Sequence, residues 1–362
     1  MSRKLFIIFI VLAIILSITS FSLIKQTNTI YSQSEHSIGT FVFNNIKIDD
    51  IKTVKIINPD LNTITLHKKS NSWVVKSLYD YPADTNKLSD LFHEIANLKV
   101  VQNVRTTPRA YEELNLLPPN STKKGKAIKI QFYSDKEKLL YSLLIGKKRF
   151  ATDCDSRTQI AVGRYVRLPS QKNIILTDEL FNNINFKAND WLYDPNISIS
   201  NIKKIELSKN SKIEWILARN TAEEDFLLKG TPKYEVLNKQ RIEAITNSLN
   251  NLKVNSVADS KLSVAETGLN YPISLAVSTF ERTKYELLIG KIYDHNRYVK
   301  LKIIADKKTL TKHQLNQQNL FSKWIYLIDL NRIDPLLTSK DGLLSQEKKK
   351  RAPINTYSHP IS

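Results

Sequence analysis

The word Leu-Leu-Ile-Gly-Lys at residues 143–147 returns unchanged at residues 287–291. Two more words recur in the same order, Asn-Leu-Lys-Val at 97–100 and 251–254, and Arg-Tyr-Val at 164–166 and 297–299. Matches that keep one order over a long interval indicate an internal repeat, and a repeat sets the architecture before any single motif does. We therefore predict a tandem duplication.

Each copy begins with apolar residues in the alternation typical of strands. The segments are 54–56, 64–66 and 73–75 in the first copy, and 202–207, 215–217 and 226–228 in the second. Turn-forming residues such as Asn58-Pro59-Asp60 separate them. The pattern predicts a three-stranded meander at the start of each copy.

A helix is expected after each meander. Its apolar residues recur every three or four positions: Leu88, Leu91, Phe92, Ile95 and Leu98 in the first copy, and Ile242, Ile245, Leu249 and Leu252 in the second. That spacing puts them on one face of a helix. Asp84 and Asn238 stand where N-caps are expected. Each helix should therefore pack its apolar face on the sheet.

The remainder of each copy predicts strands joined by hairpins. The segments are 127–133, 139–145, 164–168 and 174–177, matched by 273–280, 285–289, 297–301 and 325–328. Leu-Leu-Ile-Gly-Lys is expected to end a strand, its glycine admitting a bulge or tight turn. The expected fold class is α+β, with two tandem homologous modules, each a mainly antiparallel sheet with a packed helix, after one N-terminal transmembrane helix.

The N-terminal segment predicts a membrane span. Residues 5–24 carry no charge and follow Arg3 and Lys4, and a helix of that length reaches about 30 Å, the thickness of a bilayer core. We interpret it as an uncleaved signal anchor; a cleaved secretory signal and a buried soluble helix are the alternatives. The preceding positive charges keep the N-terminus in the cytoplasm. The expected location is the inner membrane, single-pass, with the bulk of the chain in the periplasm.

These features divide the sequence into six parts. They are a cytoplasmic tail (1–4), a transmembrane signal anchor (5–24), a linker (25–44), a first α+β repeat (45–196), a second α+β repeat (197–340) and a basic disordered tail (341–362). Residues 190–196 are expected to link the two repeats.

The overall charge bears on the class of partner. The 54 Lys and Arg residues against 35 Asp and Glu give a net charge of +19, a balance often found in nucleic-acid-binding proteins. The basic residues are scattered through every segment rather than clustered with aromatic residues, so no nucleic-acid partner is expected. A basic surface is compatible with an anionic bilayer. Cys154 is the only cysteine, which excludes an internal disulfide.

No pattern in the sequence indicates catalysis. The six histidines form no HExxH pair, and no GxSxG string occurs. Cys154 lies between Asp153 and Asp155, whose negative charges disfavour a reactive thiolate. We therefore expect a protein that is not an enzyme, with no catalytic residues, no cofactor and no metal site.

Candidate partner-binding residues come from loops and exposed aromatic residues. Sixteen residues separate Lys147 from Arg164, against five between Lys291 and Arg297, so the first copy should carry a longer hairpin loop. Loops carry binding residues more often than scaffolds do, although a tolerated insertion is the plainer alternative. We name five candidates: Tyr79, Tyr81, Asp153, Asp155 and Tyr234.

The combined pattern resembles a bacterial family known as a domain of unknown function. The words that carry the resemblance, besides the repeated ones, are Trp73-Val74-Val75, Tyr81-Pro82-Ala83-Asp84, Glu113-Leu114-Asn115-Leu116 and Thr267-Gly268-Leu269-Asn270-Tyr271-Pro272. The resemblance covers nearly the whole chain after residue 45. The second copy matches better, because the first copy lacks the glycine of Gly268.

Members of that family are typically encoded beside an ABC-transporter permease and ATPase and an auxiliary protein of the gliding-motility type. The resemblance therefore implies a non-enzymatic, membrane-anchored extracytoplasmic accessory subunit of an ABC-type export system, which acts by binding protein or an envelope component. Its partners would be the inner membrane, the ABC permease and auxiliary subunits. The alternative is an envelope enzyme or ligand carrier that acts on glycan, lipid or peptide.

Overall fold

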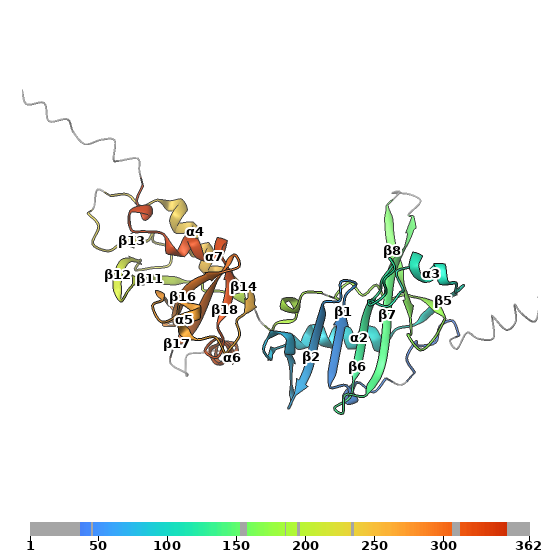
Figure 1. Ribbon diagram of the computed structural model, residues 1–362. Helices are drawn as coiled ribbons and strands as arrows, with labels where there is room; N and C mark the ends of the chain where they lie inside the picture. Colours follow the sequence, from blue (N-terminus) through green and yellow to red (C-terminus); the bar gives the residue numbers. More distant parts are fainter. Residues whose placement is uncertain are drawn as a thin grey trace, which may run out of the picture. The chain divides into compact units, whose positions relative to one another are not determined.

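The computed structural model describes residues 37–44, 46–152, 158–184, 186–193, 196–232, 235–305 and 312–345 (Figure 1). The chain divides into two compact units. The first comprises Met1–Val75 and Ala83–Trp191, and the second comprises Lys76–Pro82 and Leu192–Ser362. A short segment from the first half of the sequence therefore belongs to the second unit.

The first unit is built on one antiparallel sheet. Its strands are β1 (Thr53–Ile57), β2 (Thr63–Lys69), β3 (Ser72–Val75), β5 (Val100–Val104), β6 (Ile128–Tyr133), β7 (Leu139–Thr152), β8 (Gln159–Arg167) and β9 (Ile174–Thr177). In space they follow the order β3-β2-β1-β6-β7-β8-β9-β5, and all neighbours pair antiparallel. The two-residue β4 (Tyr81–Pro82) lies in the segment that belongs to the second unit.

The second unit has its own antiparallel sheet. Its strands are β10 (Asn196–Ile197), β11 (Ile202–Lys209), β12 (Lys212–Ala218), β13 (Leu227–Leu228), β14 (Leu252–Val257), β15 (Ile273–Thr279), β16 (Lys284–Tyr293), β17 (Asn296–Ile304) and β18 (Tyr326–Asp329). Their order in space is β10-β14-β18-β17-β16-β15-β11-β12-β13. The predicted meanders are confirmed in both units, because β1-β2-β3 and β11-β12-β13 pair in sequence.

The two sheets have the same connectivity. The order β3-β2-β1-β6-β7-β8-β9-β5 reads directly onto β13-β12-β11-β15-β16-β17-β18-β14. The similarity extends to the flank of the sheet, where Phe41 forms a bridge with Lys99 in the first unit and Asn196 pairs with Lys253 in the second. Equivalent positions can therefore be compared between the units.

The principal helix of each unit begins where its cap predicts. In the first unit α2 (Thr85–Ala96) starts after Asp84, whose side chain accepts hydrogen bonds from two backbone N–H groups. In the second unit α4 (Lys239–Asn250) starts after Asn238, which accepts from the N–H of Arg241. Both predicted N-caps are confirmed. Both predicted stripes run too far, because Leu98 lies beyond Ala96, the last residue of α2, and Leu252 is the first residue of β14.

The apolar face of α2 completes the core of the first unit. Leu88, Leu91, Phe92 and Ile95 are buried, and the ring of Phe92 lies 5.8 Å from that of Trp73 and 6.2 Å from that of Phe132. Each fully buried side chain of this size contributes about 1.5–3 kcal/mol. The helix is therefore held by tertiary packing more than by its own propensity.

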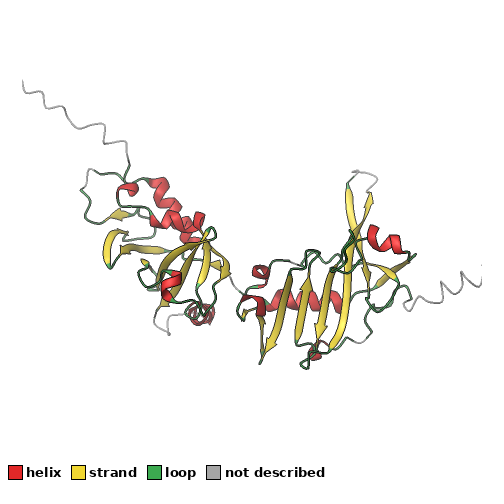
Figure 2. Cartoon of the chain, in the orientation of Figure 1, coloured by secondary structure: helices red, strands yellow, loops and turns green. Residues whose placement is uncertain are grey.

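The other helices are short. They are α3 (Pro108–Glu113), α5 (Val264–Thr267), α6 (Lys312–Phe321) and α7 (Leu330–Ile333), with 3-10 turns η1 (Ile48–Asp50), η2 (Lys76–Leu78), η3 (Ala188–Trp191), η4 (Asp334–Leu337) and η5 (Asp341–Leu343). Figure 2 shows how much of each unit consists of strands.

The expected α+β fold class is wrong, because the protein is mainly β. Among the described residues, more lie in the strands of two large antiparallel sheets than in helices, and the helices are few and short. The prediction missed the strands that follow α2 and α4, namely β5 and β14, and it ended β7 and β16 too early. The membrane span expected at residues 5–24 lies outside the described residues, and within the ranges given above no helix is long and apolar enough to cross a bilayer.

Candidate functional site

The repeated word Leu-Leu-Ile-Gly-Lys forms a bulge inside a strand. The pairing of β7 with β8 shifts register between Ile145 and Lys148, and that of β16 with β17 shifts between Ile289 and Ile292. The predicted bulge at the glycine is confirmed. The predicted end of the strand is wrong, because β7 continues to Thr152 and β16 to Tyr293.

Glycine is needed at the bulge because another backbone presses against it. A Cβ atom on Gly146 would overlap the carbonyl oxygen of Leu114, and one on Gly290 would overlap that of Thr267. The N–H of Lys147 donates to the carbonyl oxygen of Leu114 at 2.9 Å. The loop after the short helix is therefore bonded directly onto the bulge.

That loop turns through a left-handed residue in both units. Gly268 has φ +74° and Asn115 has φ +56°, and the side chains of the residues that follow, Leu116 and Leu269, reach the bulge glycine. Asparagine tolerates this conformation better than most residues. Asn115 therefore takes the place of the glycine that the first copy lacks.

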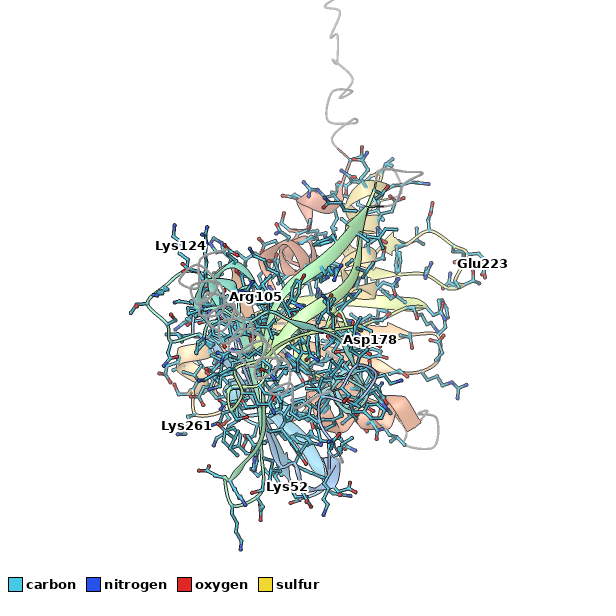
Figure 3. All side chains as sticks on the ribbon, turned by 90° about the vertical axis from the view of Figure 1, so that its right-hand side faces the viewer. Lys52, Arg105, Lys124, Asp178, Glu223 and Lys261 are labelled. Atoms are coloured by element: carbon cyan, nitrogen blue, oxygen red, sulfur yellow. The ribbon has the colours of Figure 1, made fainter. Side chains whose placement is uncertain are left out.

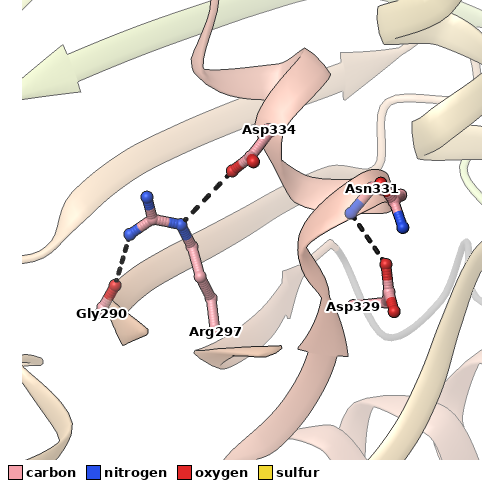
Figure 4. A network of polar contacts seen from close by, with 5 residues as sticks. All are labelled: Gly290, Arg297, Asp329, Asn331 and Asp334. Carbon is pink, nitrogen blue, oxygen red and sulfur yellow. Dashed lines mark hydrogen bonds and ion pairs between the residues drawn. The ribbon is translucent and has the colours of Figure 1, made fainter. Parts of the chain in front are cut away.

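The arginine of Arg-Tyr-Val holds the bulge from the neighbouring strand. Arg164 donates from Nε to the carbonyl oxygen of Gly146 at 2.8 Å and from Nη1 to that of Leu180 at 2.9 Å. Arg297 donates from Nη1 to the carbonyl oxygen of Gly290 at 3.1 Å, and its Nε lies 3.7 Å from Oδ1 of Asp334 (Figure 4). Burial lowers the pKa of Arg164. In both units, the arginine of Arg-Tyr-Val thus donates a hydrogen bond to the glycine carbonyl of Leu-Leu-Ile-Gly-Lys.

The first copies of these two words, at residues 143–147 and 164–166, lie within a family match. Residues 73–272 match a family described as Domain of unknown function (DUF4340). The chain belongs to the DUF4340 family. This agrees with the predicted domain of unknown function. No curated protein and no solved structure matches this DUF4340 chain.

The predicted site residues differ in their exposure to solvent. Tyr79 is exposed, with 45% of its surface accessible, whereas Tyr81 is fully buried. The expected exposure of Tyr81 is wrong, because its ring packs 5.1 Å from that of Trp324 and 6.2 Å from that of Tyr326. Asp153, Asp155 and Tyr234 lie outside the described residues.

The long hairpin of the first DUF4340 unit stands out from its sheet (Figure 1). Pairing of β6 with β7 stops at Ile145, and pairing of β9 with β8 stops at Arg164. Residues 149–152 and 159–163 therefore pair only with each other among the described strands. We call these two segments the arm.

Apolar side chains are exposed on the arm. Phe150, Ile160 and Val162 keep 52%, 53% and 48% of their surface accessible. The base of the arm is fixed, because Arg149 donates from Nη1 to Oε1 of Gln102 at 2.9 Å and Lys148 donates to the side chain of Asn182. The unequal lengths of the two hairpins predicted the arm. The exposure of Phe150, Ile160 and Val162 could not be predicted, because it depends on whether another segment packs over them.

A second candidate in this DUF4340 chain is a group of carboxylates beside α2. The pKa of Glu94 is raised, first by burial and then by the charges of Glu179 and Asp90. Its Oε1 accepts from Asn183, and its buried Oε2 has no hydrogen-bond partner in the described part of the chain. No three His, Cys, Asp or Glu side chains among the described residues are grouped so that they could hold a metal ion.

Charged side chains lie on exposed loops of both units. Figure 3 shows Lys124 and Lys261 pointing outward from loops, with acidic residues such as Glu223 elsewhere on the surface. The arm leaves three large apolar side chains uncovered on a projecting element. It is the candidate functional site.

Proposed function

We propose that this DUF4340 protein is a non-enzymatic accessory subunit held at the outer face of the inner membrane, where its arm binds a protein partner. The observation that carries the proposal is the exposure of Phe150, Ile160 and Val162 on a ribbon fixed at its base. Burying such side chains on binding contributes about 1.5–3 kcal/mol each before the costs of association.

The backbone of the arm favours a protein over other partners. Both of its strands have an outer edge that pairs with no other described strand. Exposed edges of this kind bind extended segments of other proteins by strand addition. A partner that offers an apolar extended segment would satisfy the edge and cover the side chains together.

The location and the partner are supported by the sequence. The uncharged residues 5–24 after Arg3 and Lys4 support an anchor, with the rest of the chain outside the cytoplasm. The resemblance to a family encoded beside ABC-transporter genes supports an export system. The partner proposed is therefore the permease of such a system or one of its auxiliary subunits.

The test is co-purification of the full-length protein from its own membranes. We expect the double variant Phe150→Ser, Ile160→Ser to lose the permease or auxiliary subunit that accompanies the wild type, while thermal unfolding changes little. Ile213→Ser is the matched control, because Ile213 is similarly exposed on the edge of the other sheet, and it should keep the partner. Equal recovery of the partner by the arm variant and the control would overturn the proposal.

A further inference from the structure

The hairpin of the second unit that corresponds to the arm is short and carries tyrosine instead. Tyr293 pairs directly with Asn296 across a turn in which Asp294 and His295 both have positive φ. Directly paired residues lie on one face of a sheet, and so do residues two apart along a strand. Tyr293, Asn296 and Tyr298 therefore share a face.

Two tyrosine rings stack on this face. The rings of Tyr293 and Tyr298 lie 5.7 Å apart at 31°, with Tyr298 buried below and Tyr293 55% exposed above. Burial raises the pKa of Tyr298, followed by the charges of Tyr293, Glu266 and Tyr79. Tyr79 belongs to the same unit, in the segment Lys76–Pro82.

The backbone at Tyr79 is strained, and the buried side chain of Tyr81 fixes the segment. Tyr79 and Asp80 have φ values of +57° and +63°, a conformation that costs roughly 1–2 kcal/mol for each non-glycine residue. Tyr81 anchors the segment, because it is buried and its hydroxyl donates to the carbonyl oxygen of Tyr193 at 3.3 Å. Strain of this kind persists where the surrounding structure enforces it, often at binding sites.

Two amides border the stack. Asn255 donates from Nδ2 to Oδ1 of Asn296 at 2.8 Å, and Asn296 donates from Nδ2 to the carbonyl oxygen of Asp294 at 2.6 Å. Among the hydrogen bonds of the described residues, these two leave Oδ1 of Asn255 as an acceptor and one Nδ2 hydrogen of Asn296 as a donor. A ligand amide, with one N–H and one carbonyl, complements that pair.

The first unit shows that the fold does not need these residues. Counting from the equivalent words, it has Arg149 for Tyr293, Gly163 for Asn296 and Val101 for Asn255, and only Tyr165 corresponds to Tyr298. Its sheet nevertheless has the same strand order. The strand order therefore does not depend on the stack or the amides.

We propose that this surface, made of Tyr79, Tyr293, Tyr298, Asn255 and Asn296, binds an N-acetylated saccharide chain. The C–H faces of a sugar ring pack on the exposed ring of Tyr293, and the acetamido group pairs with the two asparagines. Tyrosine suits such a contact because it supplies a large rigid surface at low entropic cost. The surface is separate from the arm, so this proposal does not rest on the proposed function.

The test titrates the full chain in detergent with chitotetraose, an oligomer of N-acetylglucosamine, by calorimetry, with maltotetraose as the comparison without acetamido groups. We expect chitotetraose to bind at least about tenfold more tightly than maltotetraose. Tyr293→Ala should weaken chitotetraose binding by about tenfold or more, whereas Tyr293→Phe should retain it. Asn255→Ala should reduce the preference for the acetylated sugar.

Two controls keep the outcome decisive. Tyr271→Ala removes another highly exposed tyrosine of the second unit and should bind as the wild type does. The arm variant Phe150→Ser should also bind chitotetraose normally, which separates this site from the partner site. No binding of chitotetraose by the wild type, or equal losses in Tyr293→Ala and Tyr271→Ala, would refute the saccharide site.

Discussion

Asn115 and Gly268 illustrate how single residues meet one requirement in two ways. Both have a left-handed backbone and lie where the loop turns onto the bulge. The absence of a glycine in the first copy could be read from the sequence, but its replacement by asparagine at that turn could not, because the alignment depends on which backbone touches Gly146. At this scale, backbone conformation is preserved rather than residue identity.

Glu94 gives a prediction for a single carboxyl group. Its folded pKa is raised above the ordinary value of 4.5, so the folded state binds the proton more tightly than the unfolded state. The charged form therefore destabilises the fold at neutral pH, and this penalty is relieved as pH falls through the folded pKa. Glu94→Gln should raise the free energy of unfolding at pH 7.5, by less than about 1 kcal/mol for a partly exposed group.

The measurement is urea unfolding of wild type and Glu94→Gln across pH. The difference between them should shrink as pH falls and vanish below the unfolded pKa. Glu223→Gln, in an exposed loop, is the control and should show no such trend. A variant that is less stable than the wild type at pH 7.5 would contradict the direction.

At the scale of elements, some features could be predicted and others could not. The helices α2 and α4 were found because a cap and a periodic stripe are both local signals. The strands β5 and β14 were missed because each begins within a few residues of the end of its helix, where Leu98 and Leu252 fit the helical stripe equally well. The bulge was expected from its glycine, but a strand continuing beyond it depends on pairing with a distant segment.

The arginine that holds the bulge gives a prediction for an element. Arg297→Ala removes the donor to Gly290 and the partner of Asp334, leaving a largely enclosed carbonyl without its bond. We expect a loss of about 1–3 kcal/mol in the free energy of unfolding. Arg297→Lys should recover only part of it, because one ammonium group cannot replace the planar guanidinium.

Chemical unfolding with urea measures both variants. Arg241→Ala is the matched control, because Arg241 is exposed on α4 and its loss should change stability by no more than about 0.5 kcal/mol. Arg297→Ala indistinguishable from Arg241→Ala would show that the arginine does not stabilise the bulge.

At the scale of the whole molecule, charge is the least balanced property. The net charge of +19 repels itself in the compact state, and no internal disulfide offsets that repulsion. Ion pairs such as Arg109–Glu113 and Lys239–Asp225 are exposed and contribute little. Screening by salt should therefore relieve more repulsion than it removes attraction.

Thermal unfolding followed by circular dichroism tests this balance. We expect the Tm of the full chain to rise between about 20 mM and about 500 mM sodium chloride, since the Debye length shortens severalfold over that range. The double variant Lys123→Glu, Lys124→Glu lowers the net charge in an exposed loop and should show a smaller rise. A Tm that falls with salt would mean that attraction dominates.

The segment Lys76–Pro82 has a consequence for synthesis. Tyr81 packs against Trp324, so the second unit joins residues that leave the ribosome far apart in time. The core of that unit can be completed only when almost the whole chain has been made, and contacts of such long sequence separation slow folding. Until Trp324 and Tyr326 have been synthesised, the ring of Tyr81 lacks its native neighbours. During that interval it is exposed to binding by chaperones.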